Sequence, residues 1–250
     1  MGSGRGADES RLGFAQFHCM MPRLQALLWD VDGTLADTEQ QGHRPAFNAA
    51  FTAAGLPWHW DSSTYQRLLH TSGGRERILA WMDELGQRDE GLAAQLHRSK
   101  QKHYGDLLSR GAVPLRPGVL ALACEAAAAG LQQWIVTTSG RAAVAALLQN
   151  TPELEACFAG WICGDDVTRK KPDPEAYAMA LGQLKLPASE VLAIEDSPQG
   201  LAAARGAGLE VVITTDNWSG GAAALAEAAL VVEHLGQGPV TLQQLSALLP

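Results

Sequence analysis

The chain has 250 residues, of which 46% are hydrophobic and 18% are charged. This composition is typical of a folded globular protein of one or two domains and excludes wholesale disorder. Lysine and arginine number 19 against 27 aspartate and glutamate residues, so the formal net charge is −8. Such an excess of acid argues against non-specific binding of nucleic acid or of an anionic membrane, although a local basic pocket for a small anion remains allowed.

Residues 1–21 are expected to form a flexible Gly/Ser extension. They lack the apolar segment of a secretory signal peptide, and either Met20 or Met21 could be the true start. No apolar run reaches the roughly 18 residues that a transmembrane helix needs. We therefore expect no membrane partner.

The cysteines are dispersed, at positions 19, 124, 157 and 163. None belongs to a C-x-x-C pair, which disfavours a thiolate zinc site. Four scattered cysteines in a chain of this size indicate reduced thiols in a reducing compartment. We expect a cytoplasmic protein.

An apolar strand is predicted at 24–29, where LQALLW precedes Asp30. Its continuous apolar character is typical of a central parallel strand that is buried on both faces. From Glu39 to about Arg110 the pattern is helical throughout. Helices are expected in that block at 40–54, 62–70, 75–86 and 90–109.

From Pro114 onward, strands and helices alternate. Strands are expected at 133–137, 159–163, 191–194, 210–213 and 230–232, and helices at 118–129, 141–149, 174–184 and 199–207. Alternating elements of this kind predict right-handed crossovers and a parallel sheet. The sequence therefore predicts an α/β fold that an all-helical block interrupts after its first strand.

Polar side chains follow three of the predicted strands. Asp30 and Asp32 follow the first strand, Thr137 the second, and Glu195 and Asp196 the fourth. In an open parallel sheet, ligands bind outside the carboxyl ends of the strands, so these groups should converge. Several carboxylates at one point repel each other and need a cation, and an all-oxygen site suits Mg²⁺.

A magnesium site of this kind suits phosphate chemistry. One carboxylate can attack phosphorus as a nucleophile. A second carboxylate, two residues further on, can protonate the leaving oxygen and later activate water. A hydroxyl group and a lysine near the same point would hold the phosphoryl oxygens.

Four segments resemble, in order, the four motifs of the haloacid-dehalogenase-like (HAD) phosphotransferases. They are DVDGTLADTE at 30–39, Thr137-Thr138-Ser139, Lys171-Pro172 within RKKPDPEAY, and IEDSPQGLAAARGAG at 194–208. The resemblance spans nearly the whole chain. It implies a Rossmann-like HAD core with a parallel sheet at 22–38 and 112–250. It also implies a small all-helical cap domain inserted at 39–111, as in the β-phosphoglucomutase-like branch.

The cap region carries a finer resemblance. GHRPAFNAAFTAAGL at 42–56, WHWDSSTYQRLL at 58–69 and TSGGRERI at 71–78 are similar to the CbbY-like sugar-bisphosphate phosphatases of autotrophs. In those enzymes the cap grips a substrate phosphate. The resemblance implies a Mg²⁺-dependent phosphatase that hydrolyses xylulose-1,5-bisphosphate, an inhibitor of Rubisco, through an aspartyl-phosphate intermediate.

The resemblance implies roles for four carboxylate residues. Asp30 is the nucleophile that becomes aspartyl-phosphate, and Asp32 is the general acid/base. The magnesium site takes Asp30, the backbone carbonyl of Asp32, and Asp196, with Glu195 next to it in a supporting role.

Further residues are implied to hold the phosphoryl group. Thr137 and the backbone of Thr138 hold it, and Ser139 of the same motif is a substrate contact. Lys171 neutralises both that group and the nucleophile. Lys170 stands where the family often has glycine, so the two lysines compete for the role, and Lys171 is favoured because it directly precedes the motif proline.

In the cap, the substrate contacts implied by the resemblance are Glu39, His43, Gly73, Gly74 and Arg75. The arginine begins a helix just after the two glycines, so its guanidinium could grip phosphate oxygens in a bidentate fork.

Simpler structural roles stay open for several of these residues. Thr137 and its neighbours could cap the following helix. The TSGG segment at 71–74 is a reasonable helix cap and turn by itself, and His43 could be an exposed polar position of a cap helix. Trp58 and Trp60 are expected to pack inside the cap rather than stack on a ligand.

Two other functions compete with the phosphatase. A mutase of the β-phosphoglucomutase kind shares the catalytic core and passes the phosphoryl group to a sugar instead of water. A non-catalytic binding protein derived from the HAD fold would be favoured by loss of the catalytic residues, which are all present. The expected partner is a small phosphorylated sugar, and the chain is expected to be a monomer.

Overall fold

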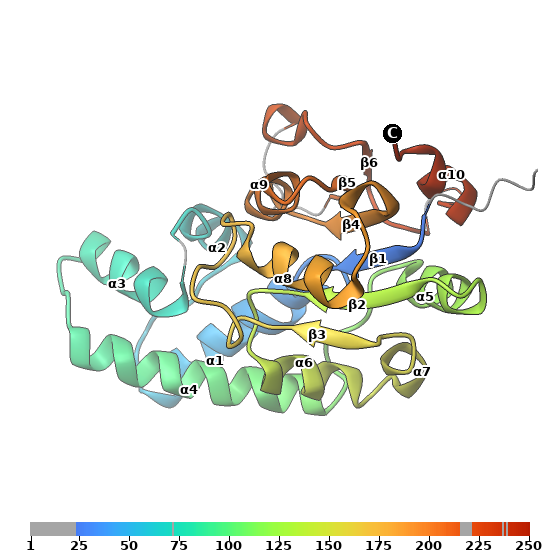
Figure 1. The fold of residues 1–250 in the computed structure, drawn as a ribbon. Helices are drawn as coiled ribbons and strands as arrows, with labels where there is room; N and C mark the ends of the chain where they lie inside the picture. The colour runs from blue at the N-terminus through green and yellow to red at the C-terminus, as the bar shows by residue number, and fades with distance from the viewer. Residues whose placement is uncertain (1–23, 72, 216–221, 237, 239) are drawn as a thin grey trace, which may run out of the picture.

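A parallel sheet lies at the centre of the molecule (Figure 1). The computed structural model describes residues 24–71, 73–215, 222–236, 238 and 240–250. Within these residues the sheet has six strands in the order β3-β2-β1-β4-β5-β6. The strands are β1 (Ala26–Trp29), β2 (Gln132–Val136), β3 (Gly160–Ile162), β4 (Val191–Glu195), β5 (Glu210–Thr214) and β6 (Leu230–Val232). All neighbours pair in parallel, which confirms the predicted α/β fold.

The two central strands end side by side. Strand β1 lies between β2 and β4, so that Trp29 is opposite both Ile135 and Ile194. Every residue of β1 and β4 is buried, as their continuous apolar character requires. The backbone N–H of Asp30 donates to the carbonyl of Ile194 at 3.0 Å. The residues that follow β1 and β4 are therefore held close together.

Helices cover both faces of the sheet. Leu27 and Trp29 of β1 point into one apolar cluster, and Ala26 and Leu28 point into the other. The first cluster packs against α5 (Val119–Ala128), α6 (Arg141–Leu148), α7 (Pro152–Glu155) and α10 (Leu242–Ala247). The second packs against α8 (Glu175–Leu184) and α9 (Pro198–Gly206). Single 3-10 turns occur at Ala188–Glu190 and Ala222–Leu225.

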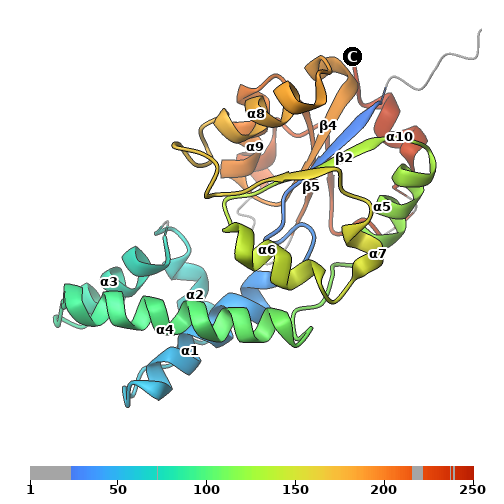
Figure 2. The same cartoon turned by 60° about the horizontal axis from the view of Figure 1, so that its bottom comes forward.

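The helices between β1 and α5 lie together to one side of the sheet (Figure 2). They are the π-helix η1 (Glu39–His43), α1 (Arg44–Ala53), α2 (Ser62–Leu68), α3 (Gly74–Glu84) and α4 (Glu90–Ser109). We call this group the cap. It has an apolar cluster of its own, built around Phe47, Trp60, Tyr65, Ile78 and Met82. We call the sheet with its flanking helices, α5 to α10, the sheet domain. Helix α4 of the cap also packs against α6 of the sheet domain.

Several elements differ from the sequence prediction. The helix expected at 40–54 begins as a π-helix, in which Gly42 approaches the ring of Tyr104 so closely that a Cβ would lie 2.7 Å from it. Helices α7 and α10 were not predicted. Helix α7 has four residues, too few for a periodic pattern, but α10 begins with a capping box of Thr241 and Gln244 that the sequence does display.

Some of the features predicted from the sequence fall on residues that the structure does not describe. The expected flexible extension at 1–21, its candidate start residues and Cys19 lie outside the described residues, as does residue 72 of the TSGG segment. Across the described ranges, no helix is both long and apolar enough to span a membrane. The division into domains at 38/39 and 111/112 stays a prediction.

We expect Trp60→Ala to destabilise the cap. Trp60 is fully buried, and its ring centroid lies 4.7 Å from that of Phe47 and 4.9 Å from that of Phe51. Removing a large aromatic side chain from a packed interior costs about 3–5 kcal/mol of unfolding free energy. Urea unfolding, followed by tryptophan fluorescence and circular dichroism, measures the loss. The half-buried Trp58 is the matched control, and an equal loss in Trp58→Ala would contradict the packing described.

Candidate active site

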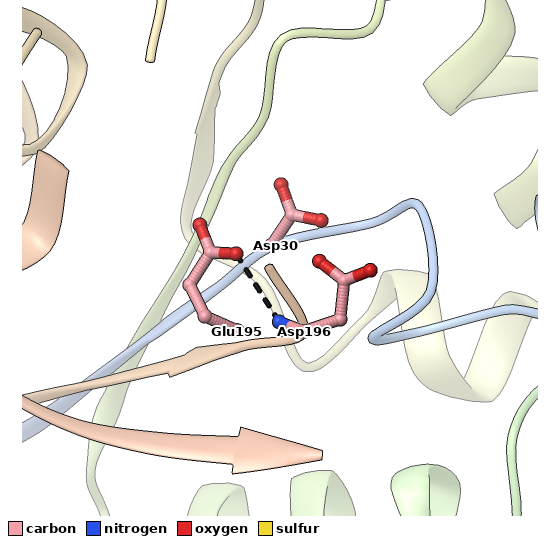
Figure 3. Close-up of side chains that lie close together, drawn as sticks. All are labelled: Asp30, Glu195 and Asp196. Atoms are coloured by element: carbon pink, nitrogen blue, oxygen red, sulfur yellow. Dashed lines mark hydrogen bonds between the residues drawn. The ribbon is translucent and has the colours of Figure 1, made fainter. Parts of the chain in front are cut away.

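Three carboxylates meet beyond the ends of β1 and β4. Asp30 follows β1, Glu195 is the last residue of β4, and Asp196 follows it. One oxygen from each carboxylate lies within 4.8 Å of the others, and Figure 3 shows the three side chains around a common space. Asp30 and Glu195 are buried and Asp196 is half-buried. We call this group the carboxylate cluster.

Two glycines make room for the cluster. Gly33 has a φ of +80°, and a Cβ there would collide with the Asp196 carboxylate. A Cβ at Gly200, in the first turn of α9, would collide with the carboxylate of Glu195. Because any larger residue would displace a carboxylate, both positions have a steric requirement for glycine.

Lys171 neutralises part of the negative charge of the carboxylate cluster. Its buried ammonium donates to Asp30 Oδ1 at 2.6 Å, to the carbonyl of Val136 at 2.8 Å, and to Glu195 Oε1. The hydroxyl of Tyr177 also donates to Glu195 Oε1, at 2.7 Å. Lys171 therefore contacts the cluster directly.

The negative charge that Lys171 leaves uncompensated would favour binding of a cation in the carboxylate cluster. Burial raises the pKa of Asp30 to about 8, with Lys171 opposing the rise and Glu195 adding to it. Burial would lower the pKa of Lys171, but the carboxylates of Asp30 and Glu195 hold it above its usual range. One ammonium against three carboxylates leaves excess negative charge in a buried place. An all-oxygen donor set with excess negative charge suits a hard divalent cation such as Mg²⁺.

Asp32 points away from the cluster and toward the cap. Its Oδ2 accepts from the hydroxyl of Ser139 at 2.5 Å, and its Oδ1 accepts from the hydroxyl of Tyr104 at 3.3 Å. His43 Nε2 lies 3.3 Å from the same Oδ1. Burial would raise the pKa of Asp32, but the hydrogen bonds of His43 and Ser139 hold it well below its usual range.

Lys100 of α4 continues this chain of contacts. The side chain is buried, its ammonium lies 2.8 Å from His43 Nδ1, and burial lowers its pKa to about 8. An ammonium group can only donate, so His43 Nδ1 accepts and Nε2 carries the proton that faces Asp32. The cap thereby contacts Asp32 directly through His43 and Tyr104, and Lys100 contacts His43 from behind.

A cavity of about 380 Å³ lies between the cap and the sheet domain. The cap lines it with polar, charged and aromatic groups and the sheet domain with loop residues. The cap residues are Glu39, His43, Phe47, Gly73, Gly74, Arg77, His97, Lys100, Gln101 and Tyr104. The sheet-domain residues are Asp32, Thr138, Ser139, Gly140, Ala143, Asp165 and Lys170.

Comparison with known proteins identifies the family to which this chain belongs. The family model for haloacid dehalogenase-like hydrolases matches residues 24–208. The chain belongs to this family. It is 45% identical over 201 residues to protein CbbY of Rhodobacter capsulatus, covering 79% of this chain and 88% of that protein. It is 43% identical to the plasmid-encoded protein CbbY of Cupriavidus necator, over 85% and 86% of the two chains.

Solved structures agree as well. The crystal structure of CbbY from Rhodobacter sphaeroides in complex with phosphate is 36% identical, with a TM-score of 0.74, over 86% of this chain and 96% of that chain. A mutant of the same protein, solved in complex with xylulose-(1,5)bisphosphate, has the same identity and TM-score. The chain is thus an HAD-like hydrolase of the CbbY-like group, and its relatives include enzymes named as phosphatases.

Most of the implied substrate contacts line the cavity of this HAD-like hydrolase. Glu39, His43, Gly73 and Gly74 do so from the cap. Thr138 and Ser139 do so from the sheet domain. Thr137 is buried behind them, and its hydroxyl accepts from the backbone N–H of Ser139 at 3.1 Å.

Arg75 is placed differently from the other implied contacts. Its guanidinium donates to Glu90 Oε2 at 2.5 Å on the half-exposed surface of the cap, and it does not line the cavity. Arg77, two residues further along α3, does line the cavity. The role expected of Arg75 stays a prediction, but the geometry favours Arg77 as the cavity-facing arginine.

Arg77 and Lys100 were missed from the sequence. Arg77 donates to the carbonyl of Leu68 at 3.2 Å and to the hydroxyl of Tyr65 at 3.0 Å, and that hydroxyl in turn donates to Glu39. Lys100 occupies the buried stripe of α4 at helical spacing from apolar neighbours. A lysine in an otherwise apolar stripe is a signal that sequence reasoning could have used.

We expect Lys171→Met and Lys170→Met to differ sharply. Removing the Lys171 ammonium leaves Asp30 and Glu195 buried without it, and breaking a buried ion pair costs about 3–5 kcal/mol. Lys170 is exposed and makes no ion pair among the described residues, so its replacement should change unfolding free energy by less than about 0.5 kcal/mol. Urea denaturation of both variants measures this difference. Equal losses would show that Lys171 does not balance the cluster.

Proposed function

We propose that this hydrolase is a Mg²⁺-dependent phosphatase of small sugar bisphosphates, with xylulose-1,5-bisphosphate as the first candidate substrate. The observation that carries the proposal is that the carboxylate cluster contains Asp30, while Asp32, two residues further on, lines a cavity that presents several cationic side chains. A relative whose crystal structure binds that bisphosphate supports the same substrate class.

Asp30 performs the first chemical step in this proposal. Lys171 holds Asp30 Oδ1, and the carboxylate attacks phosphorus to form an aspartyl-phosphate. The leaving sugar oxygen takes a proton from Asp32, whose carboxylate is ionised in the free enzyme and therefore takes up that proton from solvent before the bond to phosphorus breaks. Thr137 and the backbone of Thr138 hold the phosphoryl oxygens in the loop after β2. When bound in the cluster, Mg²⁺ would neutralise developing charge on the phosphoryl group.

Asp32 also acts in the second step. Its contacts with His43, Tyr104 and Ser139 favour the ionised form. The ionised carboxylate can take a proton from the water that attacks the aspartyl-phosphate. Because two of these three contacts come from the cap, the cap and the sheet domain together position the general base.

The second phosphate of the substrate would bind at the cap side of the cavity. Gly73 and Gly74 begin α3, whose first backbone N–H groups are free of intrahelical partners. Arg77 and Lys100 add positive charge from the cap, and Lys170 adds it from the sheet domain. The second phosphate group of a bisphosphate would therefore contact cationic side chains from both the cap and the sheet domain. A substrate with a single phosphate would not need these additional cationic side chains.

The two alternative functions can be distinguished from a phosphatase by the products that are released. A β-phosphoglucomutase-type mutase would release a rearranged sugar phosphate and no inorganic phosphate, and a non-catalytic binding protein would release neither. Action as a monomer in the cytoplasm on a small phosphorylated sugar is part of the same proposal.

We expect Asp30→Asn to lower the rate of phosphate release from xylulose-1,5-bisphosphate at least about a thousandfold, because the amide cannot attack phosphorus. EDTA should abolish release by the wild-type enzyme, and added Mg²⁺ should restore it. Inorganic phosphate is measured over time, with β-glucose-1-phosphate as a second substrate. Asp83→Asn, an exposed change on α3, is the control and should retain full activity. Activity above a tenth of wild type in Asp30→Asn, or full activity in EDTA, would refute the mechanism.

We expect Arg77→Ala to raise KM for the bisphosphate about tenfold or more, since a charged hydrogen bond contributes about 1.5–3 kcal/mol. Hydrolysis of a small aryl phosphate, which lacks a second phosphate, should barely change. Steady-state kinetics of both substrates measure this difference, with Arg75→Ala as the matched control because Arg75 pairs with Glu90 outside the cavity.

Two outcomes would contradict the assignment of Arg77. Equal losses on the two substrates, together with a lower unfolding free energy, would mean that Arg77 serves only its contacts with Leu68 and Tyr65. A bisphosphate-specific loss in Arg75→Ala instead would return the role to Arg75.

A further inference from the structure

Two cysteines from different elements lie side by side on the sheet domain. Cys124 belongs to α5, and Cys157 follows α7. They are 33 positions apart in sequence, but their Sγ atoms are 3.9 Å apart. Helices α5 and α7 pack against each other there, as Figure 2 shows.

The two thiols differ in their surroundings. Cys124 is exposed, and Cys157 is half-buried with its thiol donating to the carbonyl of Glu153 at 3.2 Å. Burial and the neighbouring Cys124 raise the pKa of Cys157 to about 11. Cys124 is therefore the sulfur that an oxidant in solution meets first, while Cys157 stays a protonated thiol beside it.

We propose that Cys124 and Cys157 form a reversible intramolecular disulfide when the protein meets a peroxide. The sulfurs must approach from 3.9 Å to about 2.0 Å, which side-chain rotation can supply in a surface pair. The site is independent of the proposed function, because neither cysteine lines the cavity or belongs to the carboxylate cluster.

The reaction balances in two steps. The Cys124 thiolate attacks one oxygen of hydrogen peroxide, the O–O bond breaks, and the departing hydroxide takes a proton to leave as water. The product is a sulfenic acid on Cys124. The sulfur of Cys157 then loses its proton and attacks the Cys124 sulfur, so that the S–S bond forms, the S–O bond breaks and a second water leaves. A dithiol reductant restores both thiols.

The location of the pair predicts its effect. Cys157 lies just before β3 begins, at the end of the sheet opposite to the carboxyl ends that carry Asp30 and Asp196. A link there restricts the unfolded chain more than the active site. We therefore expect the oxidised protein to melt about 5–10 °C higher than the reduced one. The rate of phosphate release should be the same in both forms.

The test uses the full chain, treated with hydrogen peroxide, then alkylated with iodoacetamide and digested for mass spectrometry. The expected result is a peptide pair joined through Cys124 and Cys157, and a thermal shift that dithiothreitol reverses. Cys124→Ser and Cys157→Ser should each lose both the link and the shift. Cys19→Ser and Cys163→Ser are the controls and should keep both.

Three results would overturn the proposal. One is full alkylation of both cysteines after oxidation. Another is a link through Cys19 or Cys163, or between two molecules. The third is a sulfinic or sulfonic acid on Cys124 with Cys157 still free, because a neighbour able to close the bond would trap the sulfenic acid first.

Discussion

The contacts of the buried Lys171 ammonium group are the interaction on which the carboxylate cluster at the end of the sheet depends. The ammonium contacts Asp30 and Glu195 at once, and Tyr177 completes the surroundings of Glu195. Removing ions from water costs several kcal/mol each, so the arrangement is stable only with all partners in place. Those partners come from β1, β4 and α8, so correct packing of the sheet domain and correct geometry of the site are one requirement.

Asp32 links this end of the sheet to the cap. It lies two residues after Asp30, yet its carboxylate turns toward His43 and Tyr104 rather than into the carboxylate cluster. Neighbouring acids in one short turn thus occupy different electrostatic environments. Burial raises the pKa of Asp30, whereas hydrogen bonds lower that of Asp32. One motif can thereby supply two carboxylates with different properties.

The parallel sheet and the carboxylates at its strand ends were predictable because strand positions and strand ends follow from local pattern, whereas the order β3-β2-β1-β4-β5-β6 was not predicted. Asp30 and Asp196 converge wherever two central parallel strands end together. Arg75 and Arg77 were not separable from sequence, because residues two apart on a helix differ in direction by roughly 200°. Which of them faces the cavity depends on how α3 packs. Lys100 stands in an otherwise apolar stripe of α4, a signal that the sequence displays, but its contacts with His43 and Phe47 depend on how α4 packs in the cap.

The apolar cluster of the cap is separate from the two clusters that flank the sheet. Its members all lie between Phe47 and Leu96, within one continuous stretch of chain. Substitutions in that interior can be compensated by their own neighbours without altering the packing of β1 or β4. The interior of the cap can therefore accumulate substitutions during evolution while the packing of the strands that precede Asp30 and Asp196 is inherited unchanged.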